Sequence, residues 1–159
     1  MNITDDVLIA LRRIIRATDL HSKHLFKSSG LTMAQVLLMR SIRNHPGVPI
    51  GDLANDVQLS QATVTTILDR LEKRQLISRE RSTVDKRKVF IALTDSGLDL
   101  VNNSPVLLQE HFLHNFTELE EWEQTLILSS LQRVAHMMDA DSIDASPILD
   151  IDVPGRDID

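Results

Sequence analysis

Small polar side chains are concentrated in one short stretch of this chain, between residues 60 and 70. They carry hydroxyls, one amide, a methyl group and one guanidinium, on Ser60, Gln61, Ala62, Thr63, Thr65, Thr66 and Arg70. In a DNA groove an amide can bond bidentately to adenine, hydroxyls can bond bases or phosphates, and methyl groups can contact the methyl of thymine. A merely solvated helix face more often carries Glu and Lys, so the pattern favours contact with base edges.

Two of these residues have alternative roles. Ser60 is a residue type that caps helices, by accepting a hydrogen bond from a free N–H of the first turn, and it can also contact a phosphate. Arg70 can bind a phosphate or pair with an acid such as Asp69. The sequence leaves both alternatives open.

A basic segment begins at the end of this stretch. Between Arg70 and Lys88 there are eight basic and three acidic residues, although the net charge of the 159-residue chain is −6. A local basic surface matters more for binding a polyanion than the total charge does. The charge distribution therefore favours nucleic acid as the partner of this segment.

A helix with one buried face is predicted to carry the polar side chains. Apolar residues recur at the spacing i, i+3, i+4 and i+7, at Val64, Ile67, Leu68 and Leu71. A brief helix at 51–57 comes before it, and Gln58 must form the tight turn between the two. This arrangement is typical of a helix-turn-helix whose second helix exposes polar side chains.

A β-hairpin is predicted to follow this helix. Residues 77–81 and 88–93 are expected to form its strands, and a charged turn at 82–87 joins them. A basic hairpin beside a small polar helix is typical of a wing next to a groove-reading helix.

The part of the chain before residue 50 is predicted to form two longer helices. The first is amphipathic and covers residues 5–28, and the second begins with the capping box Thr32–Gln35 and stops at His45. The apolar band of the first helix is wide enough to need more than one neighbour. This favours packing against a second copy over a role in the core of a monomer.

Further helices are predicted after residue 93. Thr94 is expected to cap a helix that is interrupted at Pro105. There the helix either kinks or restarts, with Ser104 as the cap and Pro105 at the first position. A second capping box, Thr117–Glu120, is predicted to start the last helix, which ends near Asp139.

Composition and end segments exclude several classes of protein. The chain has no Cys, which excludes disulfides, thiolate metal sites and thiol redox sensing. No Ser/His/Asp arrangement or phosphate loop is present, so neither enzyme activity nor a cofactor is expected.

The first residues are neither a signal peptide nor a membrane span, so a cytoplasmic protein without membrane contact is expected. Residues 140–159 alternate acids with aliphatic residues and are expected to form a disordered acidic tail.

Two histidine pairs raise the question of a metal site. His21 with His24, and His111 with His114, have the spacing of one helical face. A borderline metal would accept imidazole ligands, but few acidic residues are placed to complete the set. Half-buried interface histidines are the commoner case, so no metal site is predicted.

Three segments stand at characteristic separations: Ser60–Glu72, the wing sequence Asp85-Lys86-Arg87, and Leu93-Thr94-Asp95-Ser96-Gly97. Together with the order of elements, they resemble the MarR family of bacterial transcription regulators over about residues 7–138. The resemblance implies a mainly α fold with six helices and a small β-hairpin wing. It also implies a homodimer on palindromic operator DNA, usually acting as a repressor. Residues 31–94 would form the DNA-binding domain, and residues 1–30 and 95–139 the dimerisation region.

The resemblance assigns roles in the wing. Arg87 matches the family arginine that enters the minor groove, where narrow A·T tracts concentrate negative potential. Asp85 matches its partner, which holds the wing turn by a salt bridge. Lys86 and Lys88 are expected to contact phosphates. The competing interpretation of these residues is a solvated charged turn.

The resemblance also implies an effector. Family members often bind small aromatic acids between the dimer helices and the DNA-binding lobe, and here Leu20, His24, Phe26 and Met39 would line that crevice. Through Leu11–His21 the chain is also similar to the subgroup that controls ectoine and other compatible-solute operons, for which the signal would be ionic strength itself. The alternative to a DNA-binding regulator is a winged-helix module that binds proteins through its acidic C-terminal half.

One departure from the family concerns the turns around residues 60–72. The family often has glycine where this chain has Gln58 and Gln75. Glycine adopts a positive φ without penalty. Glutamine at both positions therefore predicts slight strain or a different turn.

Overall fold

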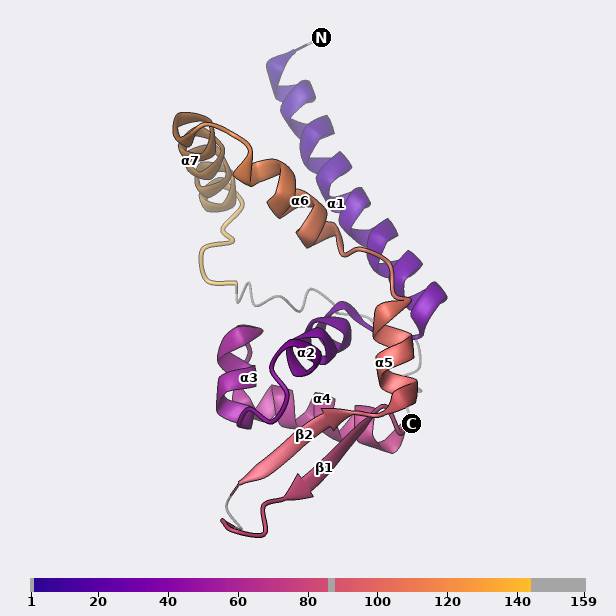
Figure 1. Cartoon of the computed structure of the whole chain (residues 1–159). Coiled ribbons are helices and arrows are strands. Elements are labelled where there is room, and N and C mark those ends of the chain that lie inside the picture. Colours follow the sequence, from indigo (N-terminus) through magenta and orange to yellow (C-terminus); the bar gives the residue numbers. More distant parts are fainter. Residues whose placement is uncertain (1, 86–87, 144–159) are drawn as a thin grey trace, which may run out of the picture. The chain divides into compact units, whose positions relative to one another are not determined.

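The computed structural model describes residues 2–85 and 88–143. Within these ranges the chain forms seven helices and one antiparallel two-stranded sheet (Figure 1). The helices are α1 (Ile3–Ser29), α2 (Met33–Asn44), α3 (Ile50–Asp56), α4 (Gln61–Lys73), α5 (Asp95–Asn102), α6 (Leu108–Thr117) and α7 (Glu121–Met137). Strands β1 (Ile77–Arg81) and β2 (Val89–Leu93) pair from Ile77–Leu93 to Arg81–Val89. This mainly α architecture with one β-hairpin confirms the predicted fold class.

The structure has one helix more than the six expected, because the chain breaks after α5. The helix ends at Asn102, before Pro105, which has no backbone N–H to donate. The next helix, α6, begins at Leu108, and the Glu110 carboxylate accepts a hydrogen bond from the Leu107 N–H (3.1 Å). Of the two alternatives at Pro105, the helix restarts and does not kink, but the N-cap residue is Leu107 and not Ser104.

The chain divides into two compact units, one reaching from the N-terminus to Pro105 and the other covering Val106–Ala145. In the first unit α2 packs against α3, α4, α5 and β2. Fully buried side chains from α2 and α4 form its core, among them Val36, Leu38, Met39, Val64, Leu68 and Leu71. Burial of each large aliphatic side chain contributes about 1.5–3 kcal/mol, so this core holds α4 in a fixed orientation.

The capping boxes predicted from the sequence had different outcomes. At the start of α2, Thr32 Oγ1 accepts from the Gln35 N–H (3.3 Å) and Gln35 Oε1 accepts from the Thr32 N–H (3.0 Å), which confirms the first box. The second box does not form at Thr117, which is the last residue of α6. The last helix instead begins after Glu120, whose N–H donates to Glu123 Oε2 (3.0 Å). The cap therefore lies three residues later than predicted, and it consists of the contact from the Glu123 carboxylate to the N-cap N–H.

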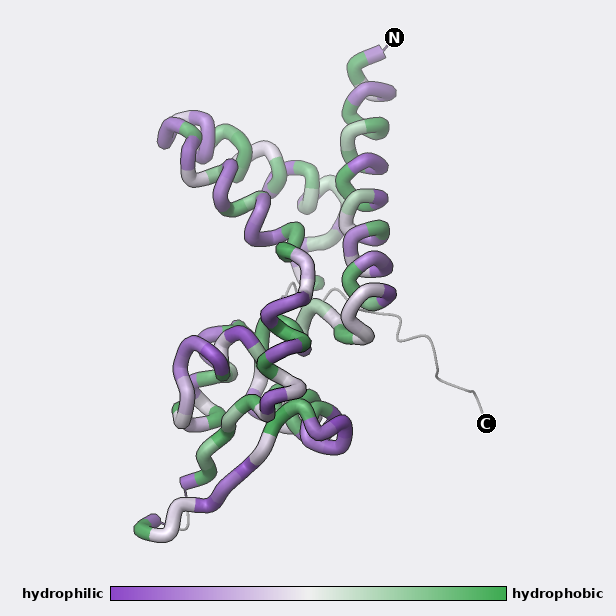
Figure 2. Tube along the Cα trace, turned by 45° about the vertical axis from the view of Figure 1, so that its right-hand side comes forward, coloured by the Kyte–Doolittle hydropathy of each residue, from purple (hydrophilic) through white to green (hydrophobic). Residues whose placement is uncertain are grey.

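The long helix α1 keeps much of its apolar surface exposed. Only Leu25 and Ser29 are buried along its 27 residues, and Figure 2 shows hydrophobic residues recurring along the helix that starts at N. Val7, Leu8, Ile14 and Ile15 are all exposed, with Ile15 at 62%. No helix among the described residues is long and apolar enough to cross a membrane.

The second unit consists of α6, α7 and the turn between them. The Gln124 side-chain amide donates to the carbonyl oxygens of Phe116 (3.1 Å) and Leu119 (3.0 Å), which ties α7 to the end of α6. Large apolar side chains are exposed on both helices, including Phe112, Leu113, Trp122, Leu126, Leu128 and Leu131.

Candidate nucleic-acid interface

The first turn of α4 is organised by its cap. Ser60 Oγ accepts a hydrogen bond from the Thr63 N–H (3.1 Å) and lies 2.8 Å from Thr63 Oγ1. This confirms the capping role of Ser60, and it engages the Thr63 hydroxyl in the same local contact. Both residues therefore fix where the helix begins.

Burial of one side of α4 turns the predicted polar set outward. Ser60, Gln61, Ala62, Thr65, Thr66 and Arg70 are exposed, and Thr63 is half-buried. Val64, Ile67, Leu68 and Leu71 are buried on the other side, as the sequence spacing predicted. The structure thus brings the predicted side chains of α4 to one surface, and their contact with bases stays a prediction.

Both turns that flank α4 contain a glutamine in the left-handed backbone conformation. The φ angle is 55° at Gln58 and 58° at Gln75. At the first turn the Leu59 N–H donates to Ala54 O (2.9 Å), and at the second the Leu76 N–H donates to Leu71 O (3.0 Å). These are Schellman motifs, in which the left-handed position usually carries glycine. The strain predicted from the missing glycines is therefore present, while the turn geometry is retained.

The turn after α4 is locked to the start of α5. Thr94 Oγ1 donates to Gln75 O (2.7 Å) and accepts from the Gly97 N–H (3.0 Å), while the Thr94 N–H donates to Leu76 O (3.1 Å). A β-carbon on Gly97 would stand 1.9 Å from Leu76 O. The Leu-Thr-x-x-Gly segment of the sequence therefore has a structural role: it fixes the end of α4 against α5.

The strand β1 is joined to α4 by Arg79. Its Nη1 lies 2.7 Å from Asp69 Oδ1 and 3.6 Å from Glu72 Oε2. The Arg79 side chain is 22% exposed, and its Nε and Nη2 atoms are buried without a hydrogen-bond partner in the part of the chain that the structure describes. Arg79 thus holds the hairpin against the exposed side of α4.

Arg74 also forms an intramolecular hydrogen bond. Its Nη1 donates to Gly30 O (2.8 Å), at the C-terminal end of α1, where a positive charge is favoured by the helix dipole. The sequence count of basic residues between 70 and 88 included both Arg74 and Arg79. Each of them binds a residue on another element of the structure, Gly30 for Arg74 and Asp69 for Arg79. Such partners cannot be predicted from sequence periodicity and spacing alone.

Four basic residues remain available on this part of the surface. Arg70, Lys73, Arg81 and Lys88 are exposed, and they form no ion pair within residues 2–85 and 88–143. Because Asp69 pairs with Arg79, the alternative in which Asp69 is the partner of Arg70 is not the arrangement observed. Arg70 is left free to bind a phosphate.

The turn of the hairpin is ordered around Ser82. Its Oγ accepts from the N–H groups of Val84 (3.2 Å) and Asp85 (3.1 Å), and the Lys88 N–H donates to Asp85 O (2.9 Å). Asp85 is half-buried and Lys88 is exposed. Lys86 and Arg87 lie outside the described residues, so the expected ion pair of Asp85 with Arg87 stays a prediction.

The residues predicted to line an effector crevice lie in different environments. Leu20, His24 and Phe26 are exposed on α1, whereas Met39 is fully buried in the core (0% exposed). Among the four histidines considered for a metal, His21 is half-buried and the others are exposed. Within the described ranges, no three His, Asp or Glu side chains are grouped closely enough to hold a metal ion.

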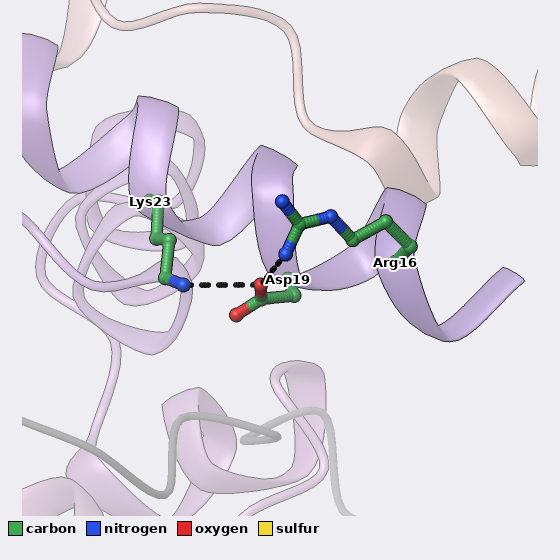
Figure 3. A network of polar contacts seen from close by, with 3 residues as sticks. All are labelled: Arg16, Asp19 and Lys23. Carbon is green, nitrogen blue, oxygen red and sulfur yellow. Dashed lines mark hydrogen bonds and ion pairs between the residues drawn. The ribbon is translucent and has the colours of Figure 1, made fainter. Parts of the chain in front are cut away.

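A charged network lies on the exposed side of α1 (Figure 3). Asp19 Oδ2 is 3.4 Å from Arg16 Nη1 and 3.1 Å from Lys23 Nζ. The two cationic side chains are largely exposed to solvent and Asp19 is half-buried, so each pair contributes at most a few tenths of a kcal/mol and weakens as salt is added. Arg16 and Asp19 of this network lie within Leu11–His21, the stretch on which the predicted likeness to compatible-solute regulators rests, and that likeness stays a prediction.

Comparison with known proteins agrees with this geometry. Residues 31–89 match the model of the MarR family. The chain is 25% identical over 133 residues to the HTH-type transcriptional repressor MdtR of Bacillus subtilis, with 82% of this chain and 86% of MdtR covered. It is 39% identical over 77 residues to the HTH-type transcriptional regulator MgrA of Staphylococcus aureus, with 48% of this chain and 52% of MgrA covered.

Solved structures support the same fold. The crystal structure of the MepR–DNA complex of Staphylococcus aureus superposes with a TM-score of 0.60 at 24% identity, covering 81% of this chain and 96% of MepR. At that identity the likeness shows the winged helix fold.

Proposed function

We propose that this chain is a DNA-binding transcriptional regulator of the MarR family, and that it is a repressor that binds a palindromic operator as a homodimer. It is not an enzyme, as its relatives are transcriptional regulators. The proposal is carried by one observation: over its first two turns α4 exposes small side chains such as Thr65 and Thr66, beside a hairpin with exposed basic residues. The repressor named among its relatives supports the direction of regulation.

In this proposal α4 enters the major groove and reads base edges. The residues that contact DNA from α4 and its cap are Ser60, Gln61, Ala62, Thr63, Thr65, Thr66 and Arg70. Arg70 binds a phosphate, because its exposed guanidinium has no acidic partner within the described ranges. The hairpin provides Arg87 for the minor groove and Lys86 and Lys88 for phosphates, while Asp85 stabilises the turn.

Exposed apolar surface supports the proposed dimer. A monomeric protein rarely leaves large contiguous apolar patches exposed, yet Ile14 and Ile15 on α1, and Trp122 and Leu126 on α7, are all more than half exposed. We assign these helices to the interface with a second copy. Two copies related by a two-fold axis would present their α4 helices to half-sites about one DNA turn, or roughly 34 Å, apart.

The signal that releases this repressor is proposed to be ionic strength, and its target genes to be those of osmotic stress and compatible solutes. The exposed Arg16–Asp19–Lys23 network is of the kind that salt screens. A small molecule bound near Leu20, His24 and Phe26 is the other candidate effector. The site of action is the cytoplasm, where the operator DNA lies.

A mobility-shift titration of the full chain against the DNA upstream of its own gene tests the proposal. A complex that resists excess non-specific competitor, with a stoichiometry of two chains per duplex, is expected. The alternative, a winged-helix module that docks on proteins through its acidic residues, predicts no competitor-resistant complex. Repeating the titration at several salt concentrations separates the effector hypotheses, because a small-molecule effector adds a ligand-dependent change at fixed salt.

A further inference from the structure

We propose that the exposed face of α4 reads the exocyclic amino groups of adenine and cytosine in the major groove and disfavours guanine at the same positions. This inference rests on the proposed function, because it requires α4 to lie in the major groove. It is carried by three side-chain oxygens that can only accept hydrogen bonds in the observed geometry: Oγ1 of Thr65, Oγ1 of Thr66 and Oδ2 of Asp69.

The two threonine hydroxyls have already used their protons. Thr65 Oγ1 donates to Gln61 O (2.8 Å) and Thr66 Oγ1 donates to Ala62 O (3.0 Å), both within α4. A hydroxyl has one proton and two lone pairs. What these exposed side chains present to the outside is therefore a lone pair and a methyl group. In this geometry they can accept from a base N–H, but they have no proton to give to guanine O6, guanine N7 or a phosphate.

Asp69 adds a third acceptor to the same surface. It follows Thr65 by four residues and Thr66 by three, which places all three side chains on one side of the helix. Its side chain is 51% exposed. Arg79 Nη1 engages Oδ1 at 2.7 Å, which leaves Oδ2 without a partner in the described part of the chain.

The ion pair explains how an acid can lie on a surface that meets a polyanion. An unpaired carboxylate would be repelled by the phosphates, whereas the Arg79 guanidinium beside Asp69 offsets its charge. The remaining oxygen can then accept from the amino group of cytosine, which is a favourable partner for Asp, or from that of adenine.

The central part of α4 carries no cationic donor that would favour guanine. Residues 62–69 contain no Lys, Arg or His. The Gln61 amide, in the first turn, can both donate and accept, so it can pair bidentately with adenine. The major-groove edge of guanine carries only the acceptors O6 and N7, whereas adenine and cytosine each offer an amino donor. A helix face that presents only hydrogen-bond acceptors therefore favours adenine and cytosine, because their amino groups can donate to it.

Modified DNA tests this proposal with the full chain. A duplex is first selected by the protein from a random-sequence library. Each adenine is then replaced, one at a time, by N6-methyladenine and each cytosine by N4-methylcytosine, which block the amino hydrogen in the major groove and keep the base pair. Affinity is expected to fall about tenfold at the contacted positions. Replacement of guanine by 7-deazaguanine, which lacks N7, is expected to change affinity by less than about twofold.

Protein variants connect the effect to individual side chains. Thr66→Val keeps the shape of the side chain and removes the acceptor, so the methylation penalty at one base pair is expected to vanish while the others remain. Thr117→Val is the matched control, because the Thr117 hydroxyl also donates to its own helix, at His114 O (3.0 Å), but lies on α6. This control is expected to leave every methylation penalty unchanged.

Two outcomes would contradict the inference in different ways. If a specific complex forms and 7-deazaguanine costs more affinity than amino methylation, α4 reads guanine acceptors and the inference alone is overturned. If no duplex is enriched in the selection, the proposed function fails and the inference fails with it.

Discussion

Gly97 and Leu76 approach so closely that a β-carbon at residue 97 would lie 1.9 Å from the Leu76 carbonyl oxygen. That oxygen also accepts a hydrogen bond from the Thr94 N–H, so it cannot move away without breaking the lock between α4 and α5. Gly97→Ala should therefore lower the free energy of unfolding by about 3 kcal/mol or more. Urea denaturation at fixed protomer concentration measures this, since dimer stability depends on concentration. The exposed neighbour Ser96 provides the control, and Ser96→Ala should change stability little. An equal destabilisation in both variants would contradict the steric argument.

For Gln58 and Gln75, which have left-handed backbone conformations, we expect substitution by glycine to raise the free energy of unfolding. Gln75→Gly removes the penalty of a β-carbon at a φ of 58°, and we expect a net gain of roughly 0.5–1 kcal/mol after the extra chain entropy of glycine. Gln58→Gly should behave in the same way. The control is Gln75→Ala, which keeps the β-carbon and should give no gain. A lower stability of the glycine variant would show that the glutamine side chain makes contacts that outweigh the backbone strain.

Arg79 should affect DNA binding without touching DNA. Arg79→Ala frees the hairpin from α4 and leaves Asp69 without its counter-charge, so affinity should fall while the dependence of affinity on salt stays unchanged. Lys88→Ala removes a cation that we assign to a phosphate, and it should reduce the slope of log K against log salt by about 0.9 for each phosphate that is no longer neutralised. Fluorescence anisotropy over a range of salt concentrations distinguishes the two. A reduced slope for Arg79→Ala would mean that Arg79 binds a phosphate directly.

The exposed apolar side of α1 should be necessary for dimer formation. Ile15→Glu places a charge on a side chain that is 62% exposed in the single chain, and it should shift sedimentation equilibrium from dimer to monomer. Arg13→Glu, on the opposite side of the same helix, changes the charge more and should leave the dimer intact. If both variants remain dimeric, α1 is not part of the interface.

The wing makes a further prediction. Arg87→Ala should weaken operator binding severely and reduce its salt dependence, because a cation leaves the narrow minor groove. Asp85→Ala should weaken binding less, since Asp85 acts on the order of the turn. Unchanged affinity and slope in Arg87→Ala would show that the wing assignment is wrong.

Much of the fold could be predicted because its signals are local. The cap at Ser60 and the capping box at Thr32–Gln35 depend on residues three apart, and the buried stripe of α4 depends on helical periodicity. The start of α7 was misplaced by three residues, because Glu123 accepts from the Glu120 N–H in the way that Glu120 was expected to accept from the Thr117 N–H.

The candidate interface could be predicted only in part, because its ion pairs join separate elements. Arg79 and Asp69 are ten positions apart and meet only when β1 folds back on α4. No local sequence pattern therefore shows that Arg79 pairs with an acid and is not available to bind nucleic acid. The protons of Thr65 and Thr66 are a similar case. The sequence shows that these hydroxyls can donate or accept hydrogen bonds. The structure shows that both already donate within α4, so that each can still accept a hydrogen bond.

Arg74 reaches from the end of α4 to the last carbonyl groups of α1, at Gly30. This hydrogen bond joins α4 to α1 within each copy. If α1 forms the dimer contact, the angle at which the two α1 helices cross therefore determines the distance between the two α4 helices. Mutations that alter only the crossing of α1 would then change the preferred number of base pairs between half-sites, without altering the preferred bases within them.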